Sequence, residues 1–106
     1  MNASMPAAIQ SFFAATNAGD RQAFVAAFAP DATLVDWGRT YAGSSEIARW
    51  NESDNIGVGS RLDVQEWSET GGRYRVKVAV SGGGFNGIGT MTFTVANDRI
   101  SRLEIT

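Results

Sequence analysis

The sequence predicts an α+β domain in which N-terminal helices pack on one face of a curved antiparallel sheet. Three observations support this class. Apolar residues recur at helical spacing in the first third of the chain, whereas they alternate with polar residues through most of the second half. Gly87 and Gly89 interrupt the alternating region, and glycines inside a strand allow a sheet to bend sharply. The 106-residue length suits one hydrophobic core, so residues 1–106 are predicted to form a single domain.

Two helices are predicted before residue 30. Ser4 is a suitable cap for a helix that begins near Met5 or Pro6, and Gly19 can end this helix. Asp20 is then the predicted N-cap of a second helix, which Pro30 closes. The apolar stripe of this second helix consists of Phe24, Ala27 and Phe28.

The spacing of apolar residues along the sequence changes after the second helix. Strand-type residues predict a strand from Ala32 to Trp37, and Tyr41-Ala42-Gly43 predicts a turn. A short helix carrying Ile47 and Trp50 should follow. The segment 54–60 contains two glycines and predicts a flexible loop.

The second half is predicted to be a meander of strands joined by glycine-rich or Asn-Asp turns. Gly71-Gly72 and Asn97-Asp98 suit tight turns between strands. The triplet Gly82-Gly83-Gly84 precedes no helix start and no Lys-Ser/Thr pair, so it predicts a hairpin connection rather than a phosphate-binding loop. The predicted strands occupy residues 62–69, 73–80, 85–95 and 100–105.

The composition excludes several classes of function. The chain has no cysteine and no histidine, which removes thiolate chemistry, Cys or His metal sites and every Ser-His or Cys-His arrangement. Its carboxylates are irregularly spaced, so we predict no metal and no cofactor. The net charge is −2 and the nine Lys and Arg residues are scattered, which argues against nucleic acid or an anionic membrane as a partner. With no signal-peptide pattern and no apolar run near the ~20 residues of a membrane span, a cytoplasmic location is expected.

Three segments resemble a known family. They are Asn17-Ala18-Gly19-Asp20, Phe28-Ala29-Pro30-Asp31-Ala32-Thr33 and Gly38-Arg39-Thr40-Tyr41-Ala42-Gly43. Together they make the chain, over essentially its whole length, similar to the nuclear transport factor 2-like superfamily in its SnoaL-like branch. The resemblance implies a cone-shaped, cystatin-like sheet whose wide end is capped by helices and encloses a ligand cavity. Members include ketosteroid isomerases, polyketide cyclases, dehydratases and proteins that only bind partners, so the fold alone does not select a function.

The resemblance also suggests one catalytic residue. Ketosteroid isomerases carry their proton-abstracting Asp in the motif Asp-Ala-Thr-x-x-Asp, and the segment from Asp31 to Asp36 has this spacing, so Asp36 matches the base. The two oxyanion donors of those enzymes, a Tyr and a neutral Asp, match Phe12 and Met91. Neither a phenyl ring nor a thioether can donate a hydrogen bond, and one such donor contributes about 3–4 kcal/mol to lowering the barrier. Steroid isomerisation is therefore disfavoured.

The candidate ligand-binding residues are mostly aromatic side chains that can form the walls of a pocket for a flat, hydrophobic molecule. They are Phe12, Trp37, Tyr41, Trp50, Tyr74 and Met91. The alternative for any one of these aromatic residues is core packing or a dimer face. For Asp36, the alternative is a structural carboxylate at a strand end that pairs with Arg39 or caps the nearby turn.

Two functions remain open at this point. The first is a small-molecule enzyme of the isomerase, cyclase or dehydratase type with Asp36 as general base. The second is a non-catalytic ligand-binding or dimerisation module whose cavity is hydrophobic or filled by side chains. Ile88, Thr90, Thr92 and Thr94 should form an outer sheet face. Relatives commonly dimerise through this surface, so a homodimer is expected; the alternative is a solvated strand face.

Overall fold

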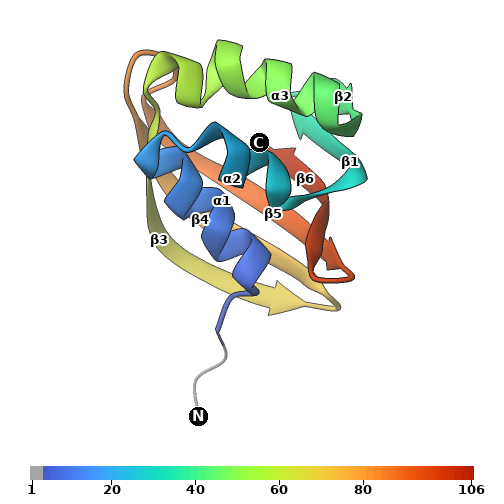
Figure 1. Ribbon diagram of the computed structural model, residues 1–106. Helices are drawn as coiled ribbons and strands as arrows, with labels where there is room; N and C mark the ends of the chain where they lie inside the picture. The colour runs from blue at the N-terminus through green and yellow to red at the C-terminus, as the bar shows by residue number, and fades with distance from the viewer. Residues whose placement is uncertain (1–3) are drawn as a thin grey trace.

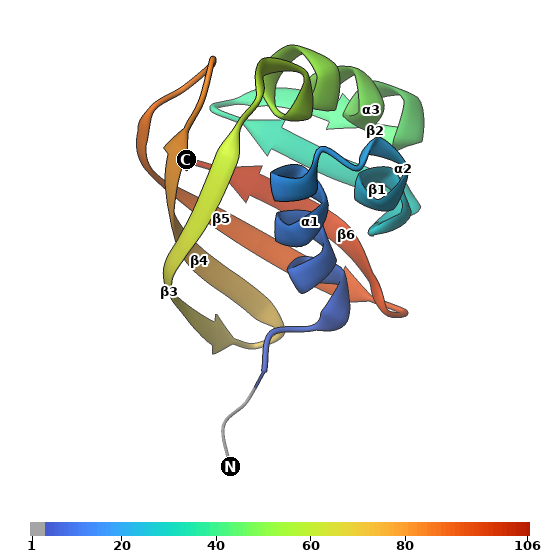
Figure 2. The ribbon, with the colours of Figure 1, turned by 60° about the vertical axis from the view of Figure 1, so that its left-hand side comes forward.

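Six strands form one curved, open sheet in the computed structural model, which describes residues 4–106 (Figure 1). In chain order the elements are α1 (Ala7–Ala18), α2 (Arg21–Ala26), β1 (Phe28–Asp36), β2 (Arg39–Ala42), α3 (Gly43–Asp54), the 3-10 turn η1 (Ile56–Val58), β3 (Arg61–Thr70), β4 (Arg73–Ser81), β5 (Gly87–Ala96) and β6 (Arg99–Ile105). The helices α1 and α2 lie on one face of the sheet, and α3 lies at the end of the sheet formed by β1 and β2 (Figures 1 and 2). The predicted α+β class is confirmed.

The strand order is β2-β1-β6-β5-β4-β3. Every neighbouring pair is antiparallel except β1 and β6, which run parallel. The prediction of an antiparallel sheet therefore needs correction at this one pair. The reason is topological: the chain leaves β1 through β2 and α3, builds β3 to β5, and returns beside β1 only with its last strand.

The core lies between α1, α2 and the inner face of the sheet. On β4, Val76 and Val78 are fully buried while Arg75 and Lys77 are exposed, which is the period of two that the sequence predicts. Phe12 on α1 lies at the centre of a group of aromatic rings, with centroid separations of 5.1–6.0 Å to the rings of Phe13, Phe24, Phe28 and Phe93. These rings fill the interior beneath the two N-terminal helices.

Local signals set the helix ends, with one exception. The Asp20 carboxylate accepts a hydrogen bond from the Ala23 N–H at 3.0 Å, so the predicted cap of α2 is confirmed. Gly19 ends α1 in the left-handed conformation, with φ at 70°. The predicted cap at Ser4 is wrong, because α1 is preceded by Pro6, whose carbonyl oxygen accepts the first helical hydrogen bonds.

Two predicted boundaries between residues 26 and 43 are wrong. The second helix ends at Ala26, and Phe28 begins β1 because it pairs with Ile100 of β6. The register of β1 is irregular between Phe28 and Thr33, and the intervening residue Pro30 is tolerated there because it has no N–H to pair. Residues 39–42 form β2 against β1, so the turn lies at residues 37–38 rather than at 41–43.

The segment predicted as a flexible loop, residues 54–60, is held by buried hydrogen bonds. Asn55 is 2% exposed, and its amide donates to Thr16 Oγ1 of α1 and to Asn51 Oδ1 of α3, each at 3.0 Å. Asn51 Oδ1 also accepts from the Ile56 N–H of η1. These bonds tie the end of α3 to both α1 and η1, because buried amides without partners are unfavourable.

Asn51→Ala should lower the free energy of unfolding by about 2 kcal/mol, because it removes the acceptor shared by the Asn55 amide and the Ile56 N–H inside the protein. Urea denaturation followed by circular dichroism measures this change. Ser45→Ala, at an exposed position of the same helix, is the matched control and should change stability by less than about 0.5 kcal/mol. Equal effects of the two substitutions would contradict a role for this amide network.

Candidate functional site

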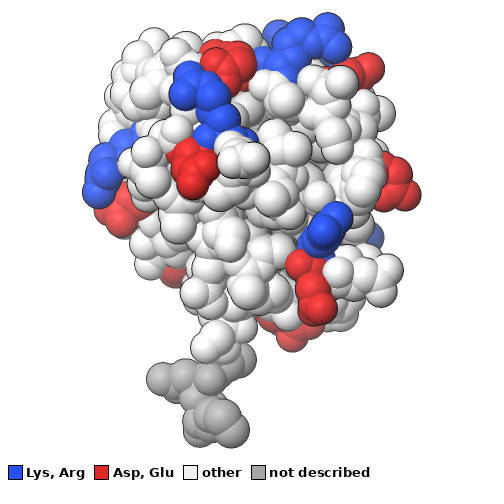
Figure 3. All heavy atoms as spheres, viewed as in Figure 1, with Lys and Arg blue, Asp and Glu red and all other residues white. Residues whose placement is uncertain are grey.

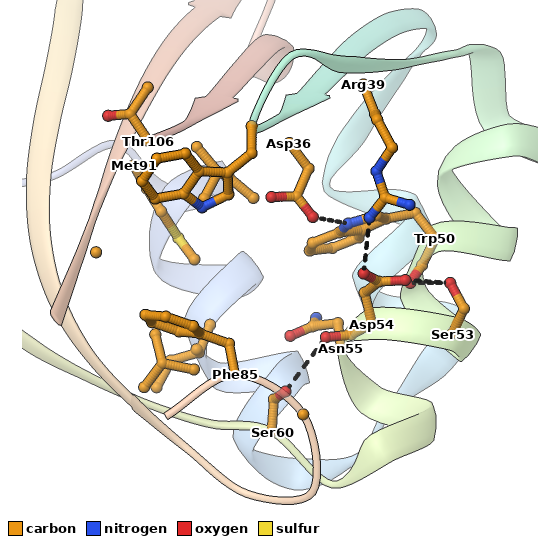
Figure 4. Close-up of a pocket in the computed structure, with 16 residues that line it drawn as sticks. Asp36, Arg39, Trp50, Ser53, Asp54, Asn55, Ser60, Phe85, Met91 and Thr106 are labelled. Carbon is orange, nitrogen blue, oxygen red and sulfur yellow. Dashed lines mark hydrogen bonds and ion pairs between the residues drawn. The ribbon is translucent and has the colours of Figure 1, made fainter. Parts of the chain in front are cut away.

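A cavity of about 280 Å³ opens beside α3, at the end of the sheet away from the aromatic rings around Phe12 (Figure 4). Its walls come from the β1–β2 turn, α3, the α3–β3 connection, the β4–β5 connection and the inner face of the sheet. The volume is close to the lower end of the range for small-molecule sites, about 300–1,000 Å³. One side of the cavity is polar and the other is apolar.

Asp36 stands on the polar side, at the last position of β1. Its Oδ2 accepts a hydrogen bond of 2.9 Å from the indole N–H of Trp50, which α3 places over the end of β1. Its carboxylate faces the cavity (Figure 4), and among the described residues Oδ1 has no hydrogen-bond partner. Trp50 itself is buried and stacks on Phe24 with ring centroids 6.2 Å apart, so the donor that fixes Asp36 is anchored in the core.

Arg39 is the cationic residue of the polar side. Arg39 is paired with Asp36 across the β1–β2 hairpin, but its guanidinium turns to Asp54 of α3, with Nη2 to Oδ2 at 3.4 Å. The other oxygen of Asp54 accepts a short hydrogen bond from the Ser53 hydroxyl. The expected alternative for Asp36, an ion pair with Arg39, is thus not formed.

The apolar side consists of strand residues that point inward, among them Leu62, Val80, Met91 and Ile105. Gly89 of β5 belongs to this side, since its partner across the strands is the buried Val78. A Cβ atom at this glycine would have the backbone oxygen of Thr106 as its nearest neighbour, at 3.8 Å. The lack of a side chain at Gly89 therefore adds space to the cavity. It is not needed to prevent a steric clash.

The β4–β5 connection borders the mouth of the cavity and presents Phe85 to it (Figure 4). The predicted hairpin role of the Gly82-Gly83-Gly84 triplet is confirmed, because these residues join two paired strands. The Gly83 N–H donates to the Val58 carbonyl oxygen at 2.8 Å, so the connection docks on η1. Asn55 and Ser60, on either side of η1, and Gly84 and Phe85 of the β4–β5 connection line this part of the cavity.

The structure brings together four of the predicted site residues and separates three. Those on the cavity wall are Asp36, Trp37, Trp50 and Met91. The other three lie elsewhere: Phe12 is fully buried among the aromatic rings of the core, Tyr41 packs on the core from β2, and Tyr74 packs against Trp67 with ring centroids 6.1 Å apart. Their prediction as ligand contacts does not fit this cavity, because each ring is used in packing.

Among the further residues on the cavity wall, Arg39, Asp54 and Phe85 are not ligand contacts predicted from the sequence, which indicates Arg39 only as a structural partner of Asp36 and Asp54 only as part of the loop 54–60, a plausible mouth of the cavity. Arg39 and Asp54 are ordinary surface charges in the sequence, and only the packing of α3 on β1 brings them together. Phe85 could have been identified from the sequence as a candidate binding residue, since it is a single large apolar residue in the glycine- and asparagine-rich segment 82–87.

The charged side chains on the face seen in Figure 3 are of mixed sign. Basic and acidic side chains are interspersed there and separated by uncharged surface. Within residues 4–106, no three His, Cys, Asp or Glu side chains gather in a way that could hold a metal ion. None of the helices described there has the length and apolar character needed to cross a membrane.

Comparison with known proteins agrees with the fold. A candidate polyketide cyclase from Sinorhizobium meliloti is 30% identical, with 96% of this chain and 95% of that chain covered and a TM-score of 0.84. The Δ5-3-ketosteroid isomerase from a Mycobacterium species is 17% identical, with 94% and 89% covered and a TM-score of 0.78. A Catenulispora acidiphila protein with a ketosteroid isomerase-like fold, solved in complex with trimethylamine, is 17% identical, with 97% and 86% covered and a TM-score of 0.79.

A comparison with curated proteins found no match. The SnoaL-like domain family matches residues 9–103, which is nearly the whole chain. The matched region contains the three segments that carry the resemblance seen in the sequence, and the SnoaL-like, nuclear transport factor 2-like prediction is confirmed. This chain belongs to the SnoaL-like domain family, is 30% identical to a candidate polyketide cyclase, and shares the fold of a ketosteroid isomerase.

Proposed function

We propose that this protein binds a small, largely apolar molecule in the cavity beside α3 and that Asp36 acts on it as a general base. The proposal rests on the hydrogen bonding and orientation of the Asp36 carboxylate. One of its oxygens is fixed by the Trp50 N–H at 2.9 Å, while the other faces an apolar cavity without a hydrogen-bond partner among the described residues. A base held in one orientation at a ligand cavity is the arrangement that proton transfer requires.

The chemistry is that of an isomerase, cyclase or dehydratase-type enzyme. In its simplest form, Asp36 takes a proton from a carbon beside a carbonyl group, and the electron pair of the C–H bond moves toward the carbonyl oxygen. The protonated Asp36 then returns the proton to another atom of the substrate. This cycle is balanced in atoms and electrons, and it needs neither a histidine nor a redox partner.

The negative charge that develops on the substrate oxygen needs a donor. Phe12 and Met91, at the positions that match the isomerase donors, cannot supply one. We assign this role to Arg39, because it lines the same cavity and its ion pair with Asp54 uses only part of its five N–H donors. The Catenulispora complex with trimethylamine supports a small organic molecule as the occupant of such a fold.

The alternative function is a non-catalytic ligand-binding or dimerisation module. Two observations favour it: the bond to Trp50 gives Asp36 a purely structural use, and Ile88 is 56% exposed on the outer face of the sheet. The neighbouring threonines at 90, 92 and 94 are partly buried and make this face suitable for contact with a second copy. A homodimer through this face is compatible with either function.

Asp36→Asn should abolish base catalysis, because the amide keeps the shape of the carboxylate but cannot accept the proton. The probe is 5-nitrobenzisoxazole, an uncharged ring compound. When a base removes the C–H proton of the isoxazole ring, the N–O bond breaks and a coloured cyanophenolate forms. The wild-type rate should exceed that of the variant by about 100-fold.

Asp31→Asn is the matched control, because Asp31 is an exposed carboxylate on the same strand and lies outside the cavity wall. This variant should retain the wild-type rate. If Asp36→Asn turns the probe over as fast as the wild type, or if the wild type shows no turnover, the non-catalytic function is favoured.

The hydrogen bond between Trp50 and Asp36 can be measured separately through a double-mutant cycle. Trp50→Phe and Asp36→Ala, alone and combined, should reveal a coupling free energy of about 1–2 kcal/mol in urea denaturation, because the bond has a charged acceptor and is partly buried. Strictly additive effects would mean that Trp50 does not orient the carboxylate. Trp50→Phe should also slow turnover of the benzisoxazole probe while Asp36 is still present.

Thr92→Arg should convert a dimer into a monomer, because it places a second long cation beside Arg75 on the outer face of the sheet. Sedimentation velocity of the wild type and the variant tests this. Gln22→Arg, at an exposed position of α2, adds the same charge away from that face and should leave the dimer intact. A monomeric wild type would rule out the dimer.

A further inference from the structure

Three hairpins described in this chain have loops of two residues. Two of these loops contain only residues that tolerate positive φ, whereas the third contains a tryptophan. The loops are Trp37-Gly38, Gly71-Gly72 and Asn97-Asp98, and all six residues have positive φ, between 49° and 86°. Glycine, asparagine and aspartate tolerate this left-handed region, whereas a bulky residue is an outlier there. Trp37, with φ at 49°, is therefore the residue that this turn should not contain on grounds of stability.

Packing in the core does not compensate for the unfavourable backbone of Trp37, because its side chain lies mostly in solvent. It is 69% exposed, and among the described residues the exposed large hydrophobic side chains are Trp37, Phe85 at 54% and Ile88 at 56%. Two of these three, Trp37 and Phe85, line the same cavity although they come from different connections. Large apolar side chains left in water at the mouth of a cavity are typical of a binding surface.

The segment that presents Phe85 is held in place. The Asn86 side chain accepts from the Gly82 N–H at 3.2 Å and donates to the carbonyl oxygens of Gly82 and Gly84 at 2.9 and 3.1 Å. A Cβ atom at Gly83 would lie 2.7 Å from the Val58 carbonyl oxygen, so the segment approaches η1 as closely as only glycine allows. Phe85 is thus displayed at the mouth by a fixed support.

The cavity also limits the charge of its occupant. Two carboxylates, Asp36 and Asp54, and one cationic side chain, Arg39, line the cavity, so the charged side chains of its wall are negative in sum. An anionic ligand would meet an uncompensated carboxylate at Asp36. The volume of about 280 Å³ is small, so an apolar molecule of moderate size would extend through the mouth, between the sites of Trp37 and Phe85.

We infer that Trp37 and Phe85 form an aromatic clamp, defined by these two side chains, which covers the protruding apolar part of a non-anionic ligand. The inference rests on the proposed use of the cavity for a small molecule and adds to it the ligand class and two binding residues. The unfavourable backbone of Trp37 is retained because the ring at this position contributes to ligand binding.

The test is a fluorescence titration of the full-length chain with Nile red, an uncharged apolar dye that is larger than the cavity. Trp37→Asn and Phe85→Ser should each weaken binding by about 10-fold through loss of apolar contact area. Ile88→Thr removes the third exposed hydrophobic side chain, which lies on the outer face, and should leave the affinity unchanged. Trp37→Asn should also raise the melting temperature by about 4 °C, because it creates the Asn-Gly pair that this turn favours.

Gly89→Leu separates this inference from the proposed function, because it fills the cavity from a position with free space. Binding lost in Gly89→Leu but unchanged in both clamp variants would keep the cavity as the site and overturn the clamp. Binding reduced in the clamp variants but unchanged in Gly89→Leu would show that the two rings bind the dye without the cavity, which would contradict the proposed use of the cavity and the clamp with it.

Three further outcomes would overturn the clamp. They are no Nile red binding by the wild type, a lower melting temperature for Trp37→Asn, and conversion of a dimer into a monomer by the clamp substitutions. The last result would show that the two rings form a contact between subunits. Stronger binding of the anionic dye anilinonaphthalene sulfonate than of Nile red would contradict the assigned ligand class.

Discussion

The packing of Phe12 determines which part of the interior can contain a cavity. Its ring is fully buried and touches the aromatic rings supplied by α1, α2, β1 and β5, so the interior beneath α1 is filled at the density of a protein core. The cavity with Asp36 on its wall lies at the end of the sheet beyond Trp50, which stacks on Phe24 at the edge of this core. Trp50 belongs to both the core and the cavity wall, as do Leu62, Met91 and Ile105; its ring packs on Phe24 and its indole N–H donates to Asp36.

This arrangement explains why the polar groups of the cavity come from its rim. In the isomerases the position that matches Phe12 supplies a hydrogen-bond donor from inside the fold, whereas here the same position supplies packing. The polar residues come instead from the end of β1, the start of β2 and the end of α3. At such positions the charges of Arg39 and Asp54 stay partly in water, which avoids the free-energy cost of burying them.

The sequence predicts the fold better than the site, and the reason is the range of the interactions. The valine rows of β4, the Asn97-Asp98 turn and the cap at Asp20 depend on neighbours along the chain, and each is confirmed. The strand pairing that ends α2 early and creates β2 depends on distant partners, so both boundaries were missed. Arg39, Asp54 and Phe85 come from three separate segments of the chain. Their proximity in the cavity depends on tertiary packing, which no local sequence pattern encodes.

The departures from local rules are concentrated where the cavity opens. The Gly71-Gly72 and Asn97-Asp98 turns, away from the cavity, contain the residues that their geometry favours, whereas the turn at the cavity contains a tryptophan. The glycine run and the exposed Phe85 lie at the same mouth. Sequences that fold well agree with their local structure except where function requires otherwise. Since the exceptions come from segments far apart in the chain and share only this cavity, a common requirement at the cavity explains them better than separate local accidents.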